Sequence, residues 1–213
     1  MPAGGLYGMY LEENPPQDDP DWWAQIEGAS FRLAPHLSGT RGAAHALIQL
    51  GMPYKVIQTP TPDQTHISGL SILWLPSVGA LSDADATLLR QFVQNGGTIF
   101  ATGDILPGSL DELGNPRLQS ALDDVFGFDG STTPARRMHE FGKGVAIFRP
   151  DLKGIDLFAG QGGNSGLAER TLGEIEQIIK LHAEETLLTD LPKGVFVDIS
   201  EVQNNQQHFY VVN

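Results

Sequence analysis

The sequence contains no cysteine, and this absence removes several chemistries at once. It excludes disulfides, thiolate metal sites and cysteine nucleophiles. Long hydrophobic runs are missing too, because no apolar stretch approaches the ~20 residues that span a bilayer. The first residues show neither the basic nor the apolar region of a secretion signal. We therefore expect a cytoplasmic protein that does not contact a membrane.

Positive charge is scarce in this chain. Thirteen Lys and Arg stand against 26 Asp and Glu, which gives a formal net charge of -13. Such a chain repels phosphate backbones, so we do not expect nucleic acid as a partner. The rest of the composition is that of an ordinary globular protein, with 40% hydrophobic and 18% charged residues. Its 213 residues suffice for one domain with a sizeable core.

Alternating strand and helix patterns predict an α/β fold. The run Leu70–Leu75 is apolar on both faces, as in a central parallel strand. Ser82 is the expected N-cap of an amphipathic helix that stops at Gly96, and Thr98–Thr102 is the next strand. These three elements form a βαβ unit. Further strands are expected at 6–11, 54–58 and 145–148, and helices at 41–50, 118–126 and 167–184.

The C-terminal segment predicts an antiparallel hairpin. Val195–Val202 alternates apolar and polar residues, and His208–Val212 returns after a turn. The predicted architecture is a three-layer αβα domain with a flavodoxin-like, mostly parallel sheet over residues 1–192. The hairpin, 193–213, lies at the edge of the same sheet or begins a further β domain. Because the apolar strand ends just before Asn213, we expect the native chain to continue beyond it, the alternative being a strand covered by this domain's own sheet.

Ligands of doubly wound sheets bind beyond the carboxyl ends of the strands, which locates the candidate pocket. The candidate pocket residues are Ser77, after the 70–75 strand, and Thr102, Gly103 and Asp104, at the end of the 98–102 strand. Asp151 follows a third. Ser77 lies in PSVGA, which lacks the first glycine of a GxSxG nucleophile turn, so a simple strand-end turn is favoured over a nucleophile. No catalytic residue is predicted.

Other motifs give weaker signals. The six histidines show no metal-binding spacing, and His139 and Glu140, as neighbours on one element, point apart. Gly160–Gly166 lacks the GK(S/T) of a phosphate loop and has Ser165 where GxGxxG needs glycine, which favours a surface loop. Trp74 is expected in the core rather than against a sugar. We therefore expect no cofactor and no metal.

The segment Gly69–Gly127 resembles the class I glutamine amidotransferase-like trimerisation domain of glycoside hydrolase family 42 β-galactosidases and related bacterial glycosidases. The resemblance is carried by LSILWLPSVGALSDADATLLRQFVQNGGTIFATGD, then by DELGNPR and LDDVFGF. In a working class I amidotransferase, a cysteine occupies the turn after a strand comparable to Thr98–Thr102. Here that turn reads ATGD, Ala101–Asp104, so the resemblance implies the fold without glutaminase chemistry.

The resemblance also implies that glycoside hydrolysis takes place elsewhere. The hydrolytic carboxylates of the related glycosidases belong to a separate barrel domain, which needs about 250 residues. We therefore expect a non-catalytic accessory or oligomerisation domain of, or related to, a bacterial β-galactosidase-like glycosidase. Its partners would be copies of itself, as a trimer or dimer, or the rest of a larger glycosidase chain. The alternative is a stand-alone small-molecule hydrolase or sugar-binding module that uses the strand-end pocket and takes a carbohydrate as ligand.

Overall fold

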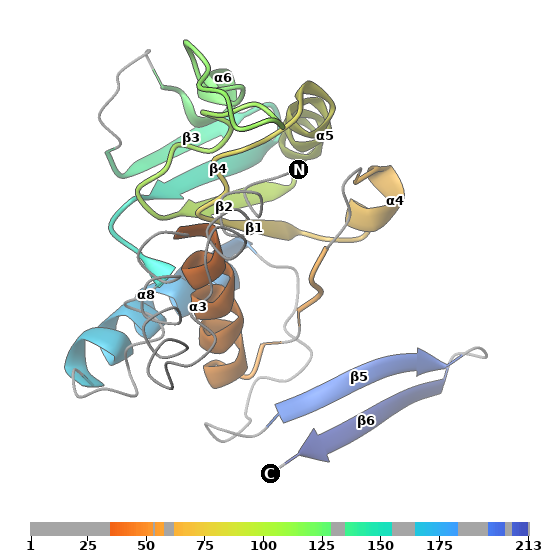
Figure 1. Ribbon diagram of the computed structural model, residues 1–213. Coiled ribbons are helices and arrows are strands. Elements are labelled where there is room, and N and C mark those ends of the chain that lie inside the picture. Colours follow the sequence, from red (N-terminus) through yellow and green to blue (C-terminus); the bar gives the residue numbers. More distant parts are fainter. Residues whose placement is uncertain are drawn as a thin grey trace, which may run out of the picture.

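The fold is built on one four-stranded mixed sheet (Figure 1). The computed structural model describes residues 35–52, 54–57, 62–128, 135–154, 165–182, 196–202 and 206–212. The strands follow the order β1-β2-β4-β3, with bounds β1 Ile72–Pro76, β2 Thr98–Thr102, β3 Arg137–Phe141 and β4 Gly144–Arg149. Strands β1, β2 and β4 are parallel, and β3 pairs antiparallel with β4. The predicted α/β class with a mostly parallel sheet is confirmed.

Helices cover both faces of this sheet (Figure 1). Strand residues alternate between the two faces, so that Ile99 packs into one hydrophobic cluster and Phe100 into the other. The first cluster includes α5 (Asp83–Gln94) and α6 (Asp123–Phe126), and the second includes α3 (Pro35–Gln49) and α8 (Ser165–His182). This is the predicted three-layer arrangement.

The N-terminus of α5 is fixed by its own sequence. Ser82 Oγ accepts a hydrogen bond from the Asp85 amide at 3.0 Å, and the Asp85 carboxylate accepts one from the Ser82 amide at 3.1 Å. This reciprocal capping satisfies two amides that the helix cannot pair internally. Leu89, Phe92 and Val93 are buried on the sheet side. The predicted cap and apolar stripe are confirmed.

Three helix predictions need correction. Helix α3 begins at Pro35, ahead of the expected Arg41, because proline is already set for the first helical position. Helix α6 spans only Asp123–Phe126, so the expected start at 118 was wrong. The helix ends at Gly127, whose left-handed backbone is typical of a helix C-cap. A short helix, α4 (Gln64–Ile67), was not predicted, although the cap formed by Asp63 gave a signal for it.

The strand predictions also differ from the structure in places. A strand was expected at 54–58, and its described part, 54–57, forms none. Tyr54 and Val56 are exposed there and do not pack against the sheet. Strand β3 was missed, since its side chains are mostly exposed and show no apolar alternation. Strand β1, expected to be central, stands at one end of the described sheet.

The C-terminal backbone forms a second, two-stranded sheet. Strand β5 (Phe196–Val202) pairs antiparallel with β6 (Gln206–Val212), and neither is hydrogen-bonded to the four-stranded sheet. The expected strand at 6–11 and most of the Gly160–Gly166 loop lie outside the described residues. Among the described helices, none combines the length and the apolar character that a bilayer crossing requires.

Candidate functional site

The carboxyl ends of β1, β2 and β4 meet at one edge of the sheet. Pro76, Thr102 and Arg149 are the last residues of these strands and pair in register across it. The turns that follow are tied together by backbone hydrogen bonds. The Ser77 amide donates to the Thr102 carbonyl at 2.7 Å, and the Gly103 amide donates to the Arg149 carbonyl at 3.2 Å. The structure thus brings the predicted residues Ser77, Thr102 and Gly103 together.

Ser77 has a strained and closely packed backbone position. Its φ of 54° lies in the left-handed region, which costs an L-residue about 1–2 kcal/mol. The residue is only 4% exposed. Two glycines make room for its hydroxyl: a Cβ on Gly39 would lie 2.9 Å from Ser77 Oγ, and a Cβ on Gly103 would overlap that atom. In a GxSxG turn, the glycines beside the serine leave space for its side chain. Here Gly39 and Gly103, which are distant in sequence, leave that space.

No base activates this serine within the described residues. The hydrogen bonds of His45, His66 and His139 go to other groups than the Ser77 hydroxyl, whereas nucleophilic serines are paired with a general base. His139 Nδ1 instead contacts the carbonyl of Val125 at 2.9 Å, and His45 contacts the side chain of Gln49. No group of three His, Cys, Asp or Glu side chains in the described ranges is arranged to hold a metal ion.

The hydroxyl of Thr102 is engaged in the core. Thr102 is buried, and its Oγ1 accepts a hydrogen bond from Trp74 Nε1 at 2.9 Å. The Trp74 ring packs against Phe100, with ring centroids 5.0 Å apart. Because a partly buried indole N–H still needs an acceptor, Thr102 serves the packing of Trp74. The structure therefore places Trp74 in the core, where the sequence predicted it.

Asp104 points away from this packed corner. Its carboxylate forms an ion pair with Lys153 Nζ at 3.2 Å, and both side chains are exposed. Exposed pairs of this kind contribute little to stability, because solvent screens them. Asp104 is the one charged residue among the four predicted pocket residues, and its charge is already paired with that of Lys153.

A network of charged residues at the end of β4 was missed by the sequence analysis. Arg149 donates to Asp151 at 3.0 and 2.8 Å and also contacts Glu174 on α8, while Arg136 donates to Asp151 at 2.8 and 2.7 Å. Hydrogen bonds from Arg149 lower the pKa of Glu174. Burial acts to raise the pKa of Asp151, but the hydrogen bonds from Arg149 and Arg136 outweigh it and lower that pKa. Only Asp151 had a sequence signal, its position after a strand.

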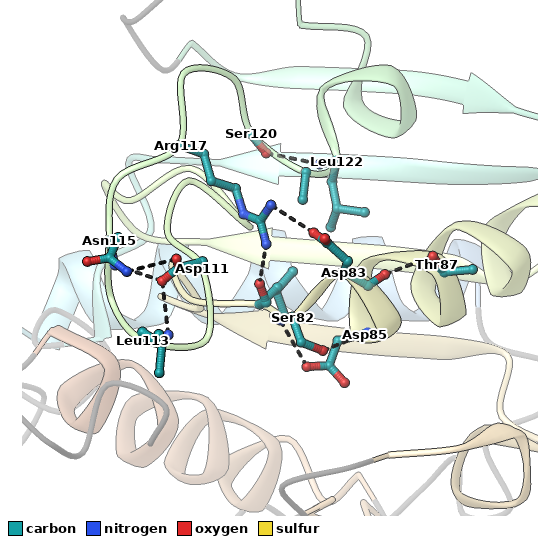
Figure 2. Close-up of polar contacts among 12 residues, drawn as sticks. Ser82, Asp83, Asp85, Thr87, Asp111, Leu113, Asn115, Arg117, Ser120 and Leu122 are labelled. Carbon is teal, nitrogen blue, oxygen red and sulfur yellow. Dashed lines mark hydrogen bonds and ion pairs between the residues drawn. The ribbon is translucent and has the colours of Figure 1, made fainter.

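A second polar cluster fixes the loop between β2 and α6. Figure 2 shows Arg117 reaching toward the start of α5, where it donates to the Leu81 carbonyl at 3.0 Å and pairs with Asp83 at 2.8 Å. Asp111 accepts hydrogen bonds from the amides of Leu113 and Asn115 at 2.9 and 2.8 Å. Through the contacts of Arg117, the loop that follows Gly103 is held against the start of α5.

Comparisons with known proteins define the fold but not a family. No family model matches the chain, and no curated protein matches it. The β-galactosidase from Bacillus circulans sp. alkalophilus matches 84% of this chain with a TM-score of 0.62 and 16% identity. A catalytic mutant of Gan42B, a GH42 β-galactosidase from G. stearothermophilus, matches 76% with a TM-score of 0.54 and 18% identity. The β-galactosidase from Rahnella sp. R3 matches 74% with a TM-score of 0.52 and 16% identity.

The match covers only a part of each of those proteins. The chain spans 31% of the B. circulans chain, 28% of the Gan42B chain and 29% of the Rahnella chain. At these identities the likeness establishes a shared fold, and residue roles do not transfer with it.

Proposed function

We propose that this chain is a non-catalytic accessory or assembly domain, related to the amidotransferase-like trimerisation domain of β-galactosidase-like glycoside hydrolases. The observation that carries the proposal is partial coverage. The fold corresponds to less than a third of each β-galactosidase chain, so most of each of those proteins lies outside the shared fold. A (β/α)8 barrel alone needs about 250 residues, which is more than the 213 residues of this chain. The chain therefore fits an accessory or assembly domain better than the hydrolytic barrel.

The strand-end residues support the same proposal. The chain has no thiol for amidotransfer. The Thr102 hydroxyl is bound by Trp74, and Asp104 is paired with Lys153. Neither is positioned beside a described base that would turn it into a nucleophile. These side chains are used for packing and for surface charge rather than for chemistry.

Turnover assays test the absence of catalysis. The purified chain is incubated with glutamine and, separately, with an aryl β-galactoside, beside the variants Thr102→Val and Asp104→Asn. We expect no turnover above a blank with any of the three proteins. Turnover that disappears in either variant would assign the reaction to this chain and overturn the proposal.

Light scattering or sedimentation tests the assembly role. We expect the chain to form a trimer or a dimer at micromolar concentration, because assembly domains associate through their own surface. A species of 23.0 kDa alone, the mass of one chain, would contradict an intrinsic assembly function. Sedimentation after addition of a separately expressed glycosidase barrel then measures the alternative partner, the rest of a larger enzyme.

A further inference from the structure

Strand β3 forms one end of the described sheet (Figure 1). It pairs with β4 on one side, and no described strand pairs with its other side. The strand also carries an apolar side chain in solvent, because Met138 is 63% exposed. The unpaired edge of a sheet is a template for another strand unless its side chains prevent pairing. The groups of β3 that point outward therefore decide what this edge can bind.

The backbone groups of Met138 and Glu140 point away from β4. Glu140 stands opposite Val145 in the antiparallel pair. The Val145 amide donates to the Gly97 carbonyl at 3.4 Å, on the side of β2, so it does not bond to β3. Hydrogen-bonded and non-bonded positions alternate along an antiparallel pair. Glu140 and Met138 thus both lie at non-bonded positions, where the N–H and C=O groups face the outer edge.

The side chains on one face of this edge have a self-complementary order. Residues two apart in extended backbone share a face, so Arg136, Met138 and Glu140 lie on the same side. Their order is positive, apolar and negative. A second copy that runs antiparallel presents the reverse order, so Arg136 would meet Glu140 of the second copy and the two Met138 side chains would meet each other. An edge with charges of one sign repels a copy of itself, whereas this order attracts one.

Both charged residues can take part in such a contact. Glu140 is exposed and forms no ion pair or hydrogen bond with a described residue. Arg136 donates to Asp151 through Nε and Nη2 at 2.8 and 2.7 Å, which leaves its third guanidinium nitrogen for a second carboxylate. Residues 136–143 carry three cations and one anion, so the acidic excess of the chain does not lie at this edge.

We propose that two copies of this chain join their β3 edges as antiparallel strands about a two-fold axis at Met138. Each Met138 then exchanges backbone hydrogen bonds with its counterpart, and the ion pair between Arg136 and Glu140 forms twice. The inference rests on the proposed assembly function and names the surface that serves it. A two-fold contact closes on itself, so this edge builds a dimer and not a trimer.

Sedimentation equilibrium of the whole chain measures this pairing. We expect a species of twice the 23.0 kDa mass of one chain. Glu140→Arg places like charges opposite each other at both ends of the contact, and we expect the dissociation constant of the dimer to rise at least about tenfold. Glu112→Arg is the matched control, because it makes the same change of charge on the exposed loop between β2 and α6 and should associate as the parent does.

Exchange of the charges separates a lost contact from a damaged fold. Arg136→Glu should also weaken the dimer, and an equimolar mixture of Arg136→Glu and Glu140→Arg should restore it, because opposite charges then meet again at both positions. Met138→Pro removes an outward N–H that does not bond to β4, and should weaken the dimer as well.

The possible outcomes distinguish this inference from the assembly function. An oligomer that Glu140→Arg and Met138→Pro both leave intact would overturn the pairing of β3 alone. A parent trimer would do the same and would keep the assembly function. A parent chain that stays monomeric would overturn both.

Discussion

The ends of β1 and β4 stand at the same edge of the sheet and are built in opposite ways. At the end of β4, Arg149 is charged and has carboxylate partners in Asp151 and Glu174. At the end of β1, Ser77 is neutral, is held in a left-handed backbone and has no described partner for its hydroxyl. The first end uses its polar groups to join β4 to α8. The second end instead holds a closely packed serine against the glycines Gly39 and Gly103.

The difference shows why a strand-end position alone does not identify a site. Thr102, between these two ends, is polar and buried but serves Trp74. What separates the three positions is the partner of each side chain, because a satisfied polar group offers little to a ligand and an unsatisfied one is costly until it finds one. Four predictions test this contrast between the strand ends.

The largest effect is expected from Gly103→Ala. Gly103 has a φ of +96°, and the new Cβ would overlap Ser77 Oγ, so both backbone strain and a clash arise. We expect a loss of about 3 kcal/mol in the free energy of unfolding, measured with denaturant. Gly114→Ala is the matched control, because its φ is +85° but nothing lies within 4 Å of a Cβ there. Equal losses in the two variants would mean that Ser77 does not crowd Gly103.

Arg149→Gln should destabilise the chain by about 2 kcal/mol, because Asp151 and Glu174 lose charge-assisted hydrogen bonds in a partly buried setting. Lys180→Gln is the control. Lys180 pairs with Glu176 at 2.7 Å on the exposed face of α8, where such a pair contributes only about 0.5 kcal/mol. If the two variants lose the same stability in denaturant unfolding, the β4 end is no stronger than a surface pair.

Acid should weaken the β4 end. The pKa values of Asp151 and Glu174 are lower in the folded chain than in the unfolded chain. Their contribution to the free energy of unfolding is therefore complete at a pH above the ordinary pKa of a carboxyl group. It is lost as the pH falls from about 4.5 downward. Because both groups are partly exposed, we expect a decrease of up to about 1 kcal/mol from this network. The measurement is the free energy of unfolding against pH, and Arg149→Gln should flatten this part of the curve; an unchanged slope would contradict it.

The smallest effect is expected from Ser77→Gly, and its sign is the informative part. Relief of the left-handed backbone gains about 1–2 kcal/mol, and the entropy of glycine takes back about 0.5–1 kcal/mol. The net is a stabilisation of about 0.5 kcal/mol in thermal or denaturant unfolding. Ser77→Ala keeps the strain and should stay near the parent. A clear loss of stability in Ser77→Gly would reveal a stabilising contact of the hydroxyl.

The elements that local signals define were predictable. Ser82 and Asp85 cap α5 through contacts three residues apart, and Thr98–Thr102 is apolar on both faces, so each can be recognised within one short window. The exposed edge strand β3 lacks such a pattern, since it depends on pairing with β4 and on contacts with the α6 region, such as that of His139 with the Val125 carbonyl. Residues 54–57 show the reverse case: their composition favours a strand, but Tyr54 and Val56 are exposed and the segment pairs with no described strand.

For the site, the sequence determined which polar residues follow parallel strands, because the end of each strand can be located from its apolar run. It therefore placed Ser77, Thr102 and Gly103 at one edge. Only the tertiary structure decided which of these side chains has a partner. The indole that binds Thr102 and the glycine of α3 that faces Ser77 come from distant parts of the chain. Hydrogen bonding depends on distances of a few ångströms between such residues, and the pairing of β1 with β2 and the packing of α3 on the sheet set those distances.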